Sequence, residues 1–251
     1  VIQKPIAEKL GKGARRNKLR RFRHALIETL RQSKFNIPEA NIKVFYEGRF
    51  TSIQAEFEGA NTKDYLKPFI AIECFAGKLA LPPKTKQITT LIKETLGEHC
   101  DHETRAVSCV SLDETAAEKW VALTRRVANS RVHFRESHKH LVRHLYDLYH
   151  LSKNDLLTGA YTGLVKSLIE KDRLQFRKYN SDYLNHPVQT SEAAFKALNT
   201  DPQWRDHWQH FLDNMVYDAV KPTFDDAYSH LQTMSQTIFE ALSHKAEATL
   251  H

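Results

Sequence analysis

A lysine beside an apolar stripe is the first residue whose surroundings suggest chemistry. In the segment Asp-Glu-Thr-Ala-Ala-Glu-Lys-Trp-Val-Ala-Leu (113–123), apolar side chains recur at helical spacing, at Ala116, Trp120 and Leu123. Lys119 lies next to this stripe, and its small alanine neighbours would let the ammonium approach a polyphosphate as a point charge. A surface lysine that pairs with Glu118 or Thr115 fits the same pattern.

A second helical segment, residues 141–149, combines an acid with two potentially basic side chains. Arg143, His144 and Asp147 lie on one helix face, because Asp147 follows the other two at i+4 and i+3. The opposite face carries the leucines of a core stripe: Leu141, Leu145 and Leu148. The polar face could bind the phosphates of a nucleotide, a metal or an attacking hydroxyl, although a plain helical ion pair has the same sequence.

A carboxylate in the strand-like segment Phe-Ile-Ala-Ile-Glu-Cys-Phe (69–75) is the candidate metal ligand. The alternation of a strand places Glu73 on the same face as Phe69, Ala71 and Phe75. A carboxylate on a buried face costs several kcal/mol unless it is paired or bound to a metal. If this face is open, or if the strand lies at an edge, Glu73 needs no partner.

The positive charge of the chain is concentrated at its start. The chain has a net charge of +7, and residues 1–24 alone contain nine Lys or Arg and one acid, Glu8. Such a block attracts phosphates through counterion release, so we expect a nucleic-acid contact at Arg15, Arg16, Lys18, Arg20, Arg21 and Arg23. An apolar stripe of Leu19, Phe22, Leu26 and Leu30 would dock this helix, whereas a solvated face or a flexible tail is the alternative.

Composition excludes several classes of protein. The 251 residues are 41% apolar and 27% charged, and no run approaches the roughly 20 apolar residues of a membrane span. The three cysteines form no C-x-x-C pair, which argues against a zinc ribbon and for a reducing compartment. We therefore expect a cytoplasmic protein with no membrane partner.

The predicted elements change in kind along the chain. Short β-branched or aromatic runs predict strands at Ile42–Tyr46, Ser52–Phe57, Phe69–Phe75 and Ala106–Val110. Helical spacing predicts helices near Arg16–Gln32, Thr89–Leu96, Ser111–Ala128, Ser137–Ser152, Thr162–Leu168, Ser191–Leu198, Trp204–Val220 and Pro222–Leu242, the third with a capping box of Ser111 and Glu114. The prediction is an α+β fold, in which a small mixed or antiparallel sheet with flanking helices (1–112) precedes an all-helical half (113–251).

The order of these pieces resembles a known family. A basic helix, Ile-x-Ile-Glu (70–73), Ala-Glu-Lys-x-x-Ala-Leu (117–123) and Arg-His-x-Tyr-Asp-Leu-Tyr (143–149) resemble the AbiEii/AbiGii-type nucleotidyltransferases over residues 15–155. These are toxins of bacterial toxin–antitoxin and phage-abortive systems and are similar to the DNA polymerase β superfamily. The likeness implies a nucleotidyltransferase-like sheet, Mg²⁺, an NTP donor, an acceptor that is an RNA such as tRNA or a protein, and a cognate antitoxin.

The resemblance also assigns roles to the candidate residues. It implies that Glu73 is the third acid of the metal site, that Lys119 binds nucleotide phosphate and that Asp147 belongs to the catalytic site. Because phosphoryl transfer is mostly positioning and charge neutralisation, we expect these three side chains to converge on one cleft.

The sequence departs from the family pattern at one point. The family carries two further acids in a Gly-Ser…Asp-x-Asp motif. These 251 residues contain no Gly-Ser dipeptide and no Asp-x-Asp pattern. Either an N-terminal portion that carries the motif was removed, or the protein lacks the motif naturally. The chain begins with Val1 rather than Met, which favours the expectation of removal. On that expectation the chain would bind an NTP without transferring it.

Two other functions fit parts of the sequence. A non-catalytic module that binds nucleic acid or a partner through the basic helix needs no acid site. A HEPN-like ribonuclease is suggested by two Arg-x4-His spacings, Arg135 to His140 and Arg205 to His210. The cluster His99-Cys100-Asp101-His102 is interpreted as a loop, because four adjacent residues cannot all face one ion.

Overall fold

The chain forms two compact units that divide between Leu79 and Ala80. The computed structural model describes residues 11–57, 69–89, 104–132, 139–153 and 157–247, and each unit is described by itself. The division lies upstream of the predicted limits 1–112 and 113–251, and the amides of Ala80 and Leu81 bind the Glu114 carboxylate of the helical part. The predicted limits stay a prediction.

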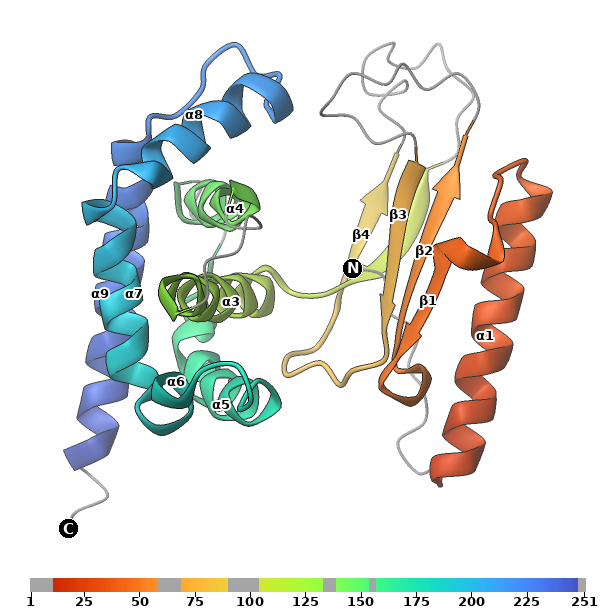
Figure 1. The fold of residues 1–251 in the computed structure, drawn as a ribbon, viewed down its shortest axis with the longest axis horizontal. Helices are drawn as coiled ribbons and strands as arrows, with labels where there is room; N and C mark the ends of the chain where they lie inside the picture. The colour runs from red at the N-terminus through yellow and green to blue at the C-terminus, as the bar shows by residue number, and fades with distance from the viewer. Residues whose placement is uncertain (1–10, 58–68, 90–103, 133–138, 154–156, 248–251) are drawn as a thin grey trace. The chain divides into compact units, whose positions relative to one another are not determined.

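The N-terminal unit consists of one helix and a three-stranded sheet (Figure 1). Helix α1 (Lys12–Gln32) precedes β1 (Ile42–Phe45), β2 (Phe50–Glu56) and β3 (Phe69–Phe75), and both strand pairs are antiparallel. Two short 3-10 helices, η1 (Glu39–Asn41) and η2 (Tyr46–Gly48), flank β1. The three predicted strands and the predicted basic helix are confirmed.

Helix α1 packs its apolar stripe on one face of this sheet. The small core comprises Ile27, Ile37, Ile53 and Ala55, with Leu26, Leu30 and Ile72 packed against it. Leu19 is also buried, but Phe22 is 47% exposed, so its predicted place in the stripe is wrong. At about 100° per residue, Phe22 lies about a quarter-turn from the centre of the buried arc.

The second unit begins with a pair of antiparallel strands, of which the sequence predicted only one. Strand β5 (Arg105–Cys109) was predicted, whereas its antiparallel partner β4 (Lys84–Ile88) was not. All five residues of β4 are exposed, and two are lysines, so this strand carries no apolar alternation. Residues 90–103 lie outside the described part of the chain. They include the cluster 99–102 and all but the first residue of the helix predicted near Thr89–Leu96.

The rest of the second unit is helical, as predicted. Its helices are α3 (Leu112–Val132), α4 (Val142–Lys153), α5 (Ala160–Gln175), α6 (Ser181–Asn185), α7 (Pro187–Thr200), α8 (Gln203–Met215) and α9 (Phe224–Glu247). The short α6 was not predicted. None of the helices in the described ranges has the length and apolar character that a bilayer crossing requires.

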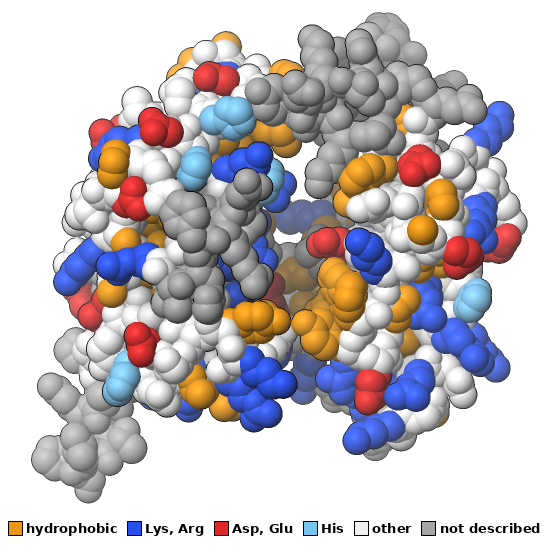
Figure 2. All heavy atoms as spheres, viewed as in Figure 1, with side chains coloured by type: hydrophobic (Ala, Val, Ile, Leu, Met, Phe, Trp, Pro, Cys, Tyr) orange, Lys and Arg blue, Asp and Glu red, His pale blue; other side chains and the backbone are white. Residues whose placement is uncertain are grey.

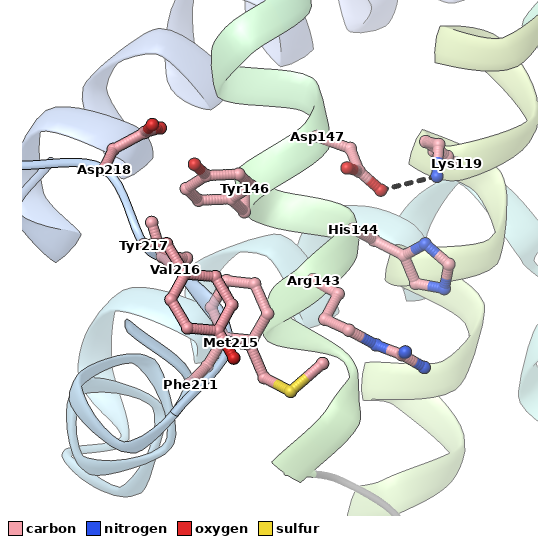
Figure 3. A pocket seen from close by; sticks show the side chains of 10 residues that line it. All are labelled: Lys119, Arg143, His144, Tyr146, Asp147, Phe211, Met215, Val216, Tyr217 and Asp218. Atoms are coloured by element: carbon pink, nitrogen blue, oxygen red, sulfur yellow. Dashed lines mark hydrogen bonds and ion pairs between the residues drawn. The ribbon is translucent and has the colours of Figure 1, made fainter. Parts of the chain in front are cut away.

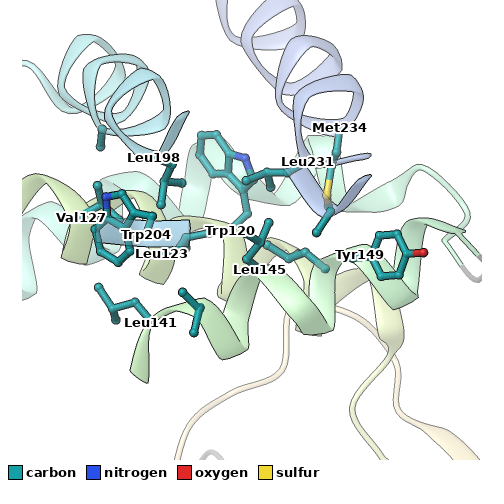
Figure 4. Packing of buried hydrophobic residues seen from close by; sticks show 14 of the residues in the cluster. Trp120, Leu123, Val127, Leu141, Leu145, Tyr149, Leu198, Trp204, Leu231 and Met234 are labelled. Atoms are coloured by element: carbon teal, nitrogen blue, oxygen red, sulfur yellow. The ribbon is translucent and has the colours of Figure 1, made fainter. Parts of the chain in front are cut away.

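Helix α3 forms the centre of this unit, because it packs against α4, α5 and α7. Figure 4 shows Trp120 and Leu123 of α3 among side chains from the surrounding helices. The core includes the predicted leucines of α4 and the predicted aromatic residues of α8 and α9: Leu141, Leu145, Leu148, Trp208 and Phe224. A helix that is apolar on most sides is stable only when other helices surround it.

Two acids at the start of α3 bind neighbouring chain segments. The Glu114 amide donates to Ser111 Oγ at 3.1 Å, which confirms the predicted cap at this end. The buried Glu114 carboxylate accepts instead from the amides of Ala80 (2.8 Å) and Leu81 (3.0 Å). Asp113 accepts from the amide and hydroxyl of Thr158. The acids thereby hold the segments that precede β4 and α5.

Glu114→Gln tests this clamp. An amide oxygen can accept from only one of the two backbone donors without placing its own NH2 against the other, so we expect the free energy of unfolding to fall by about 1–3 kcal/mol. The measurement is the urea midpoint, and Glu240→Gln on the exposed face of α9 is the matched control, expected to change stability by less than about 0.5 kcal/mol. Equal effects of the two substitutions would contradict the assignment.

Candidate functional site

A groove over α4 gathers four of the predicted site residues. A cavity of about 620 Å³ is lined by ten residues: Lys119, Arg143, His144, Tyr146, Asp147, Phe211, Met215, Val216, Tyr217 and Asp218 (Figure 3). An adjoining cavity of about 440 Å³ shares Lys119, Tyr146, Asp147 and Asp218 with it. We call this continuous depression the α4 groove. In Figure 3, α4 runs between Lys119 of α3 and the residues that follow α8.

The central polar contact of the groove is an ion pair between two helices. Lys119 Nζ of α3 lies 2.6 Å from Asp147 Oδ2 of α4. The partner of the lysine is therefore neither Glu118 nor Thr115, and the expectation that Lys119 and Asp147 share a site is met. Their side chains are 28% and 42% exposed, so the pair is open to solvent and to a ligand.

Arg143 and His144 lie in the same groove but differ in charge. The Arg143 side chain is exposed, and its Nε donates to the His140 carbonyl at 3.4 Å. His144 Nε2 lies 3.5 Å from the Arg126 guanidinium. Burial, followed by the charges of Arg126 and Lys119, lowers the pKa of His144 to about 4. The imidazole is therefore neutral at pH 7 and offers hydrogen bonds rather than the basic charge that the sequence suggested.

The sequence did not predict that aromatic residues, among them Phe211 and Tyr217, line one side of the groove. The helix predicted over Trp204–Val220 ends at Met215, so that prediction is wrong at its C-terminal end. Beyond Met215 the chain turns back on α8, because Trp208 Nε1 donates to the Pro222 carbonyl and Lys221 Nζ donates to the Leu212 carbonyl. The turn brings the following residues beside α4. A local pattern does not reveal hydrogen bonds of this kind.

Glu73 occupies an exposed position in the N-terminal unit. It pairs in register with Ser52 on the sheet face opposite the buried Ile53, so the prediction of a buried face is wrong. The physical reason is that α1 covers the other face. Convergence of Glu73 with Lys119 and Asp147 stays a prediction, because Glu73 belongs to the other compact unit.

The Mg²⁺ that the resemblance implies has no complete ligand set in the described part of the chain. Among these residues, no group of three or more His, Cys, Asp or Glu side chains could hold a metal ion. A single exposed carboxylate does not fit an octahedral cation that prefers several oxygen ligands. We therefore derive no metal-dependent step.

The predicted nucleic-acid-binding residues lie along α1. Arg16, Lys18, Arg20 and Arg21 are exposed, while Arg15 and Arg23 are partly buried. Figure 2 shows Lys and Arg side chains over the surface that α1 forms. Arg16 makes an ion pair with Glu47 at 3.5 Å, but both side chains are mostly exposed. These cations are accessible to the phosphates of a polymer.

One of the two Arg-x4-His spacings can be followed in the structure. Arg205 of α8 makes an ion pair with Asp225 at 2.7 Å and lies over the Phe224 ring at 4.7 Å. It therefore joins α8 to the start of α9. Arg135 of the other spacing lies outside the described residues.

The pKa of His144 predicts a loss of stability in mild acid. The pKa is about 6.5 in the unfolded chain and about 4 in the fold, so the unfolded state binds more protons between these values. Stability that is complete above pH 6.5 should fall as the pH drops, by about 2 kcal/mol between pH 7 and pH 5. His144→Gln removes the titrating group, so the variant should lack this loss of about 2 kcal/mol between pH 7 and pH 5. The measurement is the urea midpoint of parent and variant at each pH. Parallel curves for parent and variant from pH 7 to pH 5 would contradict it.

Comparison with known proteins places the whole arrangement in one family. The family model described as "Nucleotidyl transferase AbiEii toxin, Type IV TA system" matches residues 7–230. No curated protein and no solved structure matches the chain. The matched range includes α1, the three-stranded sheet and every residue that lines the α4 groove. The chain therefore belongs to the AbiEii nucleotidyl transferase toxin family of type IV toxin–antitoxin systems.

Proposed function

We propose that the protein is a toxin that binds an NTP in the α4 groove and transfers the nucleotide to a hydroxyl of an RNA acceptor such as a tRNA, with pyrophosphate as the leaving group. The observation that carries this proposal is the partly exposed Lys119–Asp147 ion pair at the centre of the groove. Family membership supports the reaction class and a cognate antitoxin. The substrates and the roles of the residues are our inference.

Lys119 is the proposed ligand of the polyphosphate. The partly exposed ion pair with Asp147 contributes only about 0–1 kcal/mol, and a polyphosphate carries more negative charge than one carboxylate. A phosphate can therefore replace Asp147 as the partner of Lys119. Arg143 is exposed on the same groove and would add a second positive charge.

Release of Lys119 would leave the Asp147 carboxylate available for the acceptor. A carboxylate within hydrogen-bond reach of an attacking hydroxyl can orient it and accept its proton. The neutral His144 imidazole, one helical turn before Asp147, can exchange hydrogen bonds with a phosphate or a hydroxyl without adding charge. Glu73 stays only the proposed third acid of a Mg²⁺ site that the described residues do not complete by themselves, and none of these steps passes through a metal.

The exposed cations of α1 are the proposed contact for the acceptor. Release of counterions from the RNA backbone would supply affinity without reading sequence. This assignment also serves the alternative function, a non-catalytic module that binds nucleic acid, which needs α1 but not the α4 groove.

Substitutions of the two ion-pair partners should change NTP affinity in opposite directions. Lys119→Ala should weaken binding about tenfold or more, which corresponds to roughly 1.4 kcal/mol. Asp147→Asn should leave binding unchanged or tighten it by up to about fivefold, because Lys119 no longer has to leave a carboxylate. The affinities are measured by calorimetry, since these 251 residues contain no Asp-x-Asp and binding is the direct test.

Lys166→Ala, on the exposed face of α5, is the matched control and should leave NTP affinity unchanged. If Lys119→Ala binds NTP as the parent does, the groove is not the nucleotide site. Retained RNA binding in that case would favour the non-catalytic module.

Removal of charge from α1 should weaken RNA binding and its salt dependence. Replacing Arg15, Arg16, Arg20 and Arg21 by Ala should flatten the slope of log affinity against log salt by up to about four phosphate contacts. Filter binding to total tRNA from 50 to 300 mM salt measures the slope. The control replaces four exposed cations of the other unit, Lys166, Lys171, Arg177 and Lys178, by Ala. An equal loss of slope in both variants would assign the effect to net charge alone.

A further inference from the structure

The two sides of the α4 groove differ in chemistry. Lys119, Arg143 and His144 supply polar groups, whereas Tyr146, Phe211 and Tyr217 supply aromatic rings. Figure 3 shows Lys119 and the Tyr217 ring on opposite sides of α4. The ion pair and the cations account for a phosphate but leave the rings without a role.

Two of the rings are held in place by the core. The centroid of the Tyr146 ring lies 5.3 Å from that of Phe211 and 6.0 Å from that of the buried Trp208. Burial, and then the negative charge of Asp218, raises the pKa of Tyr146. An aromatic surface that is already ordered loses little entropy when a flat ligand stacks on it.

The third ring is presented to solvent by an anchored segment. Tyr217 is 85% exposed, and its neighbour Met215 is 44% exposed. The segment that carries them is tied to α8 at its far end by the hydrogen bonds from Lys221 to the Leu212 carbonyl (2.7 Å) and from Trp208 to the Pro222 carbonyl (3.1 Å). Exposed aromatic residues beside a groove are typical anchors for ligands.

The charges of the groove give a bound nucleotide one direction. Asp218 lies at the aromatic side and would repel phosphates, while Lys119 and Arg143 lie toward the other side. An anionic ligand with a flat ring therefore fits with its ring on Tyr217 and its phosphates near Lys119. A purely apolar partner would make no use of the positive charges of Lys119 and Arg143.

We propose that Tyr217, which lines the groove together with Tyr146 and Phe211, is a stacking surface for a nucleobase whose phosphates are bound by Lys119 and Arg143. This inference rests on the proposed function and extends it to the base. The base can belong to the NTP itself or to the terminal nucleotide of the RNA acceptor. Because every base has a π-face, such a surface accepts different bases.

The test measures binding of three probes to the parent protein and to Tyr217→Ala by calorimetry. The probes are an NTP, inorganic triphosphate and a single-stranded RNA tetranucleotide. Loss of one stacked base should weaken binding about tenfold. A loss confined to the NTP identifies the base of the donor, and a loss confined to the tetranucleotide identifies that of the acceptor. Triphosphate, which has no base, should bind parent and variant alike.

Two further variants separate stacking from a structural effect. Tyr217→Phe keeps the ring and should restore binding to the parent level. Tyr179→Ala removes a tyrosine of the same unit that is 51% exposed and lies outside the groove, and it should change none of the affinities. Equal urea midpoints for all variants establish that each one folds.

The outcomes distinguish this inference from the proposed function. If triphosphate binds and Lys119→Ala abolishes that binding, but Tyr217→Ala changes neither the NTP nor the tetranucleotide, only the stacking surface is overturned. The exposed ring would then belong to another contact, such as a protein partner. If Lys119→Ala leaves triphosphate binding unchanged, or if triphosphate does not bind the parent, the proposed function fails and the stacking surface fails with it.

Discussion

The burial of α3 is the constraint on which the helical unit depends. A helix enclosed by α4, α5 and α7 can keep a charged side chain only where that charge finds a partner. Each charge near its buried faces has one: Asp113 with Thr158, Glu114 with Ala80 and Leu81, Lys119 with Asp147, and Arg125 with Asp172. The placement of the neighbouring elements follows in part from these contacts.

The ion pairs of Arg125 and Lys119 differ in exposure, and this difference decides which of them a ligand could exchange. The side chains of Arg125 and Asp172 are only 9% and 18% exposed. Arg125 lies over the Phe176 ring at 3.8 Å, and burial raises the pKa of Asp172. No ligand can replace such a pair without leaving a buried charge alone. The Lys119–Asp147 pair has the same length but faces a groove, so its exchange for a phosphate costs little.

Sequence patterns predicted what depends on spacing within one element. Leu145 and Leu148 entered the core as helical periodicity predicted. The contact of Lys119 with Asp147 joins two helices, and it was expected from the family resemblance rather than from spacing. The exposure of Glu73 was not predictable, since strand alternation defines two faces without saying which one α1 covers. The end of α8 at Met215, and with it the position of Tyr217, depends on tertiary hydrogen bonds of Trp208 and Lys221.

The charge of the groove limits what it can do alone. The negative charge of Asp147 offsets the positive charge of its ion-pair partner Lys119, and the neutral His144 adds no charge. In the sum of charges over the groove, Asp218 offsets Arg143. A site close to neutrality attracts an anion mainly at short range, through hydrogen bonds that replace the ion pair. Long-range attraction of a polyanion therefore falls to the exposed cations of α1. Under the proposed function the protein would separate two tasks: α1 would supply charge that attracts any phosphate backbone, while the α4 groove would supply geometry that fits one nucleotide.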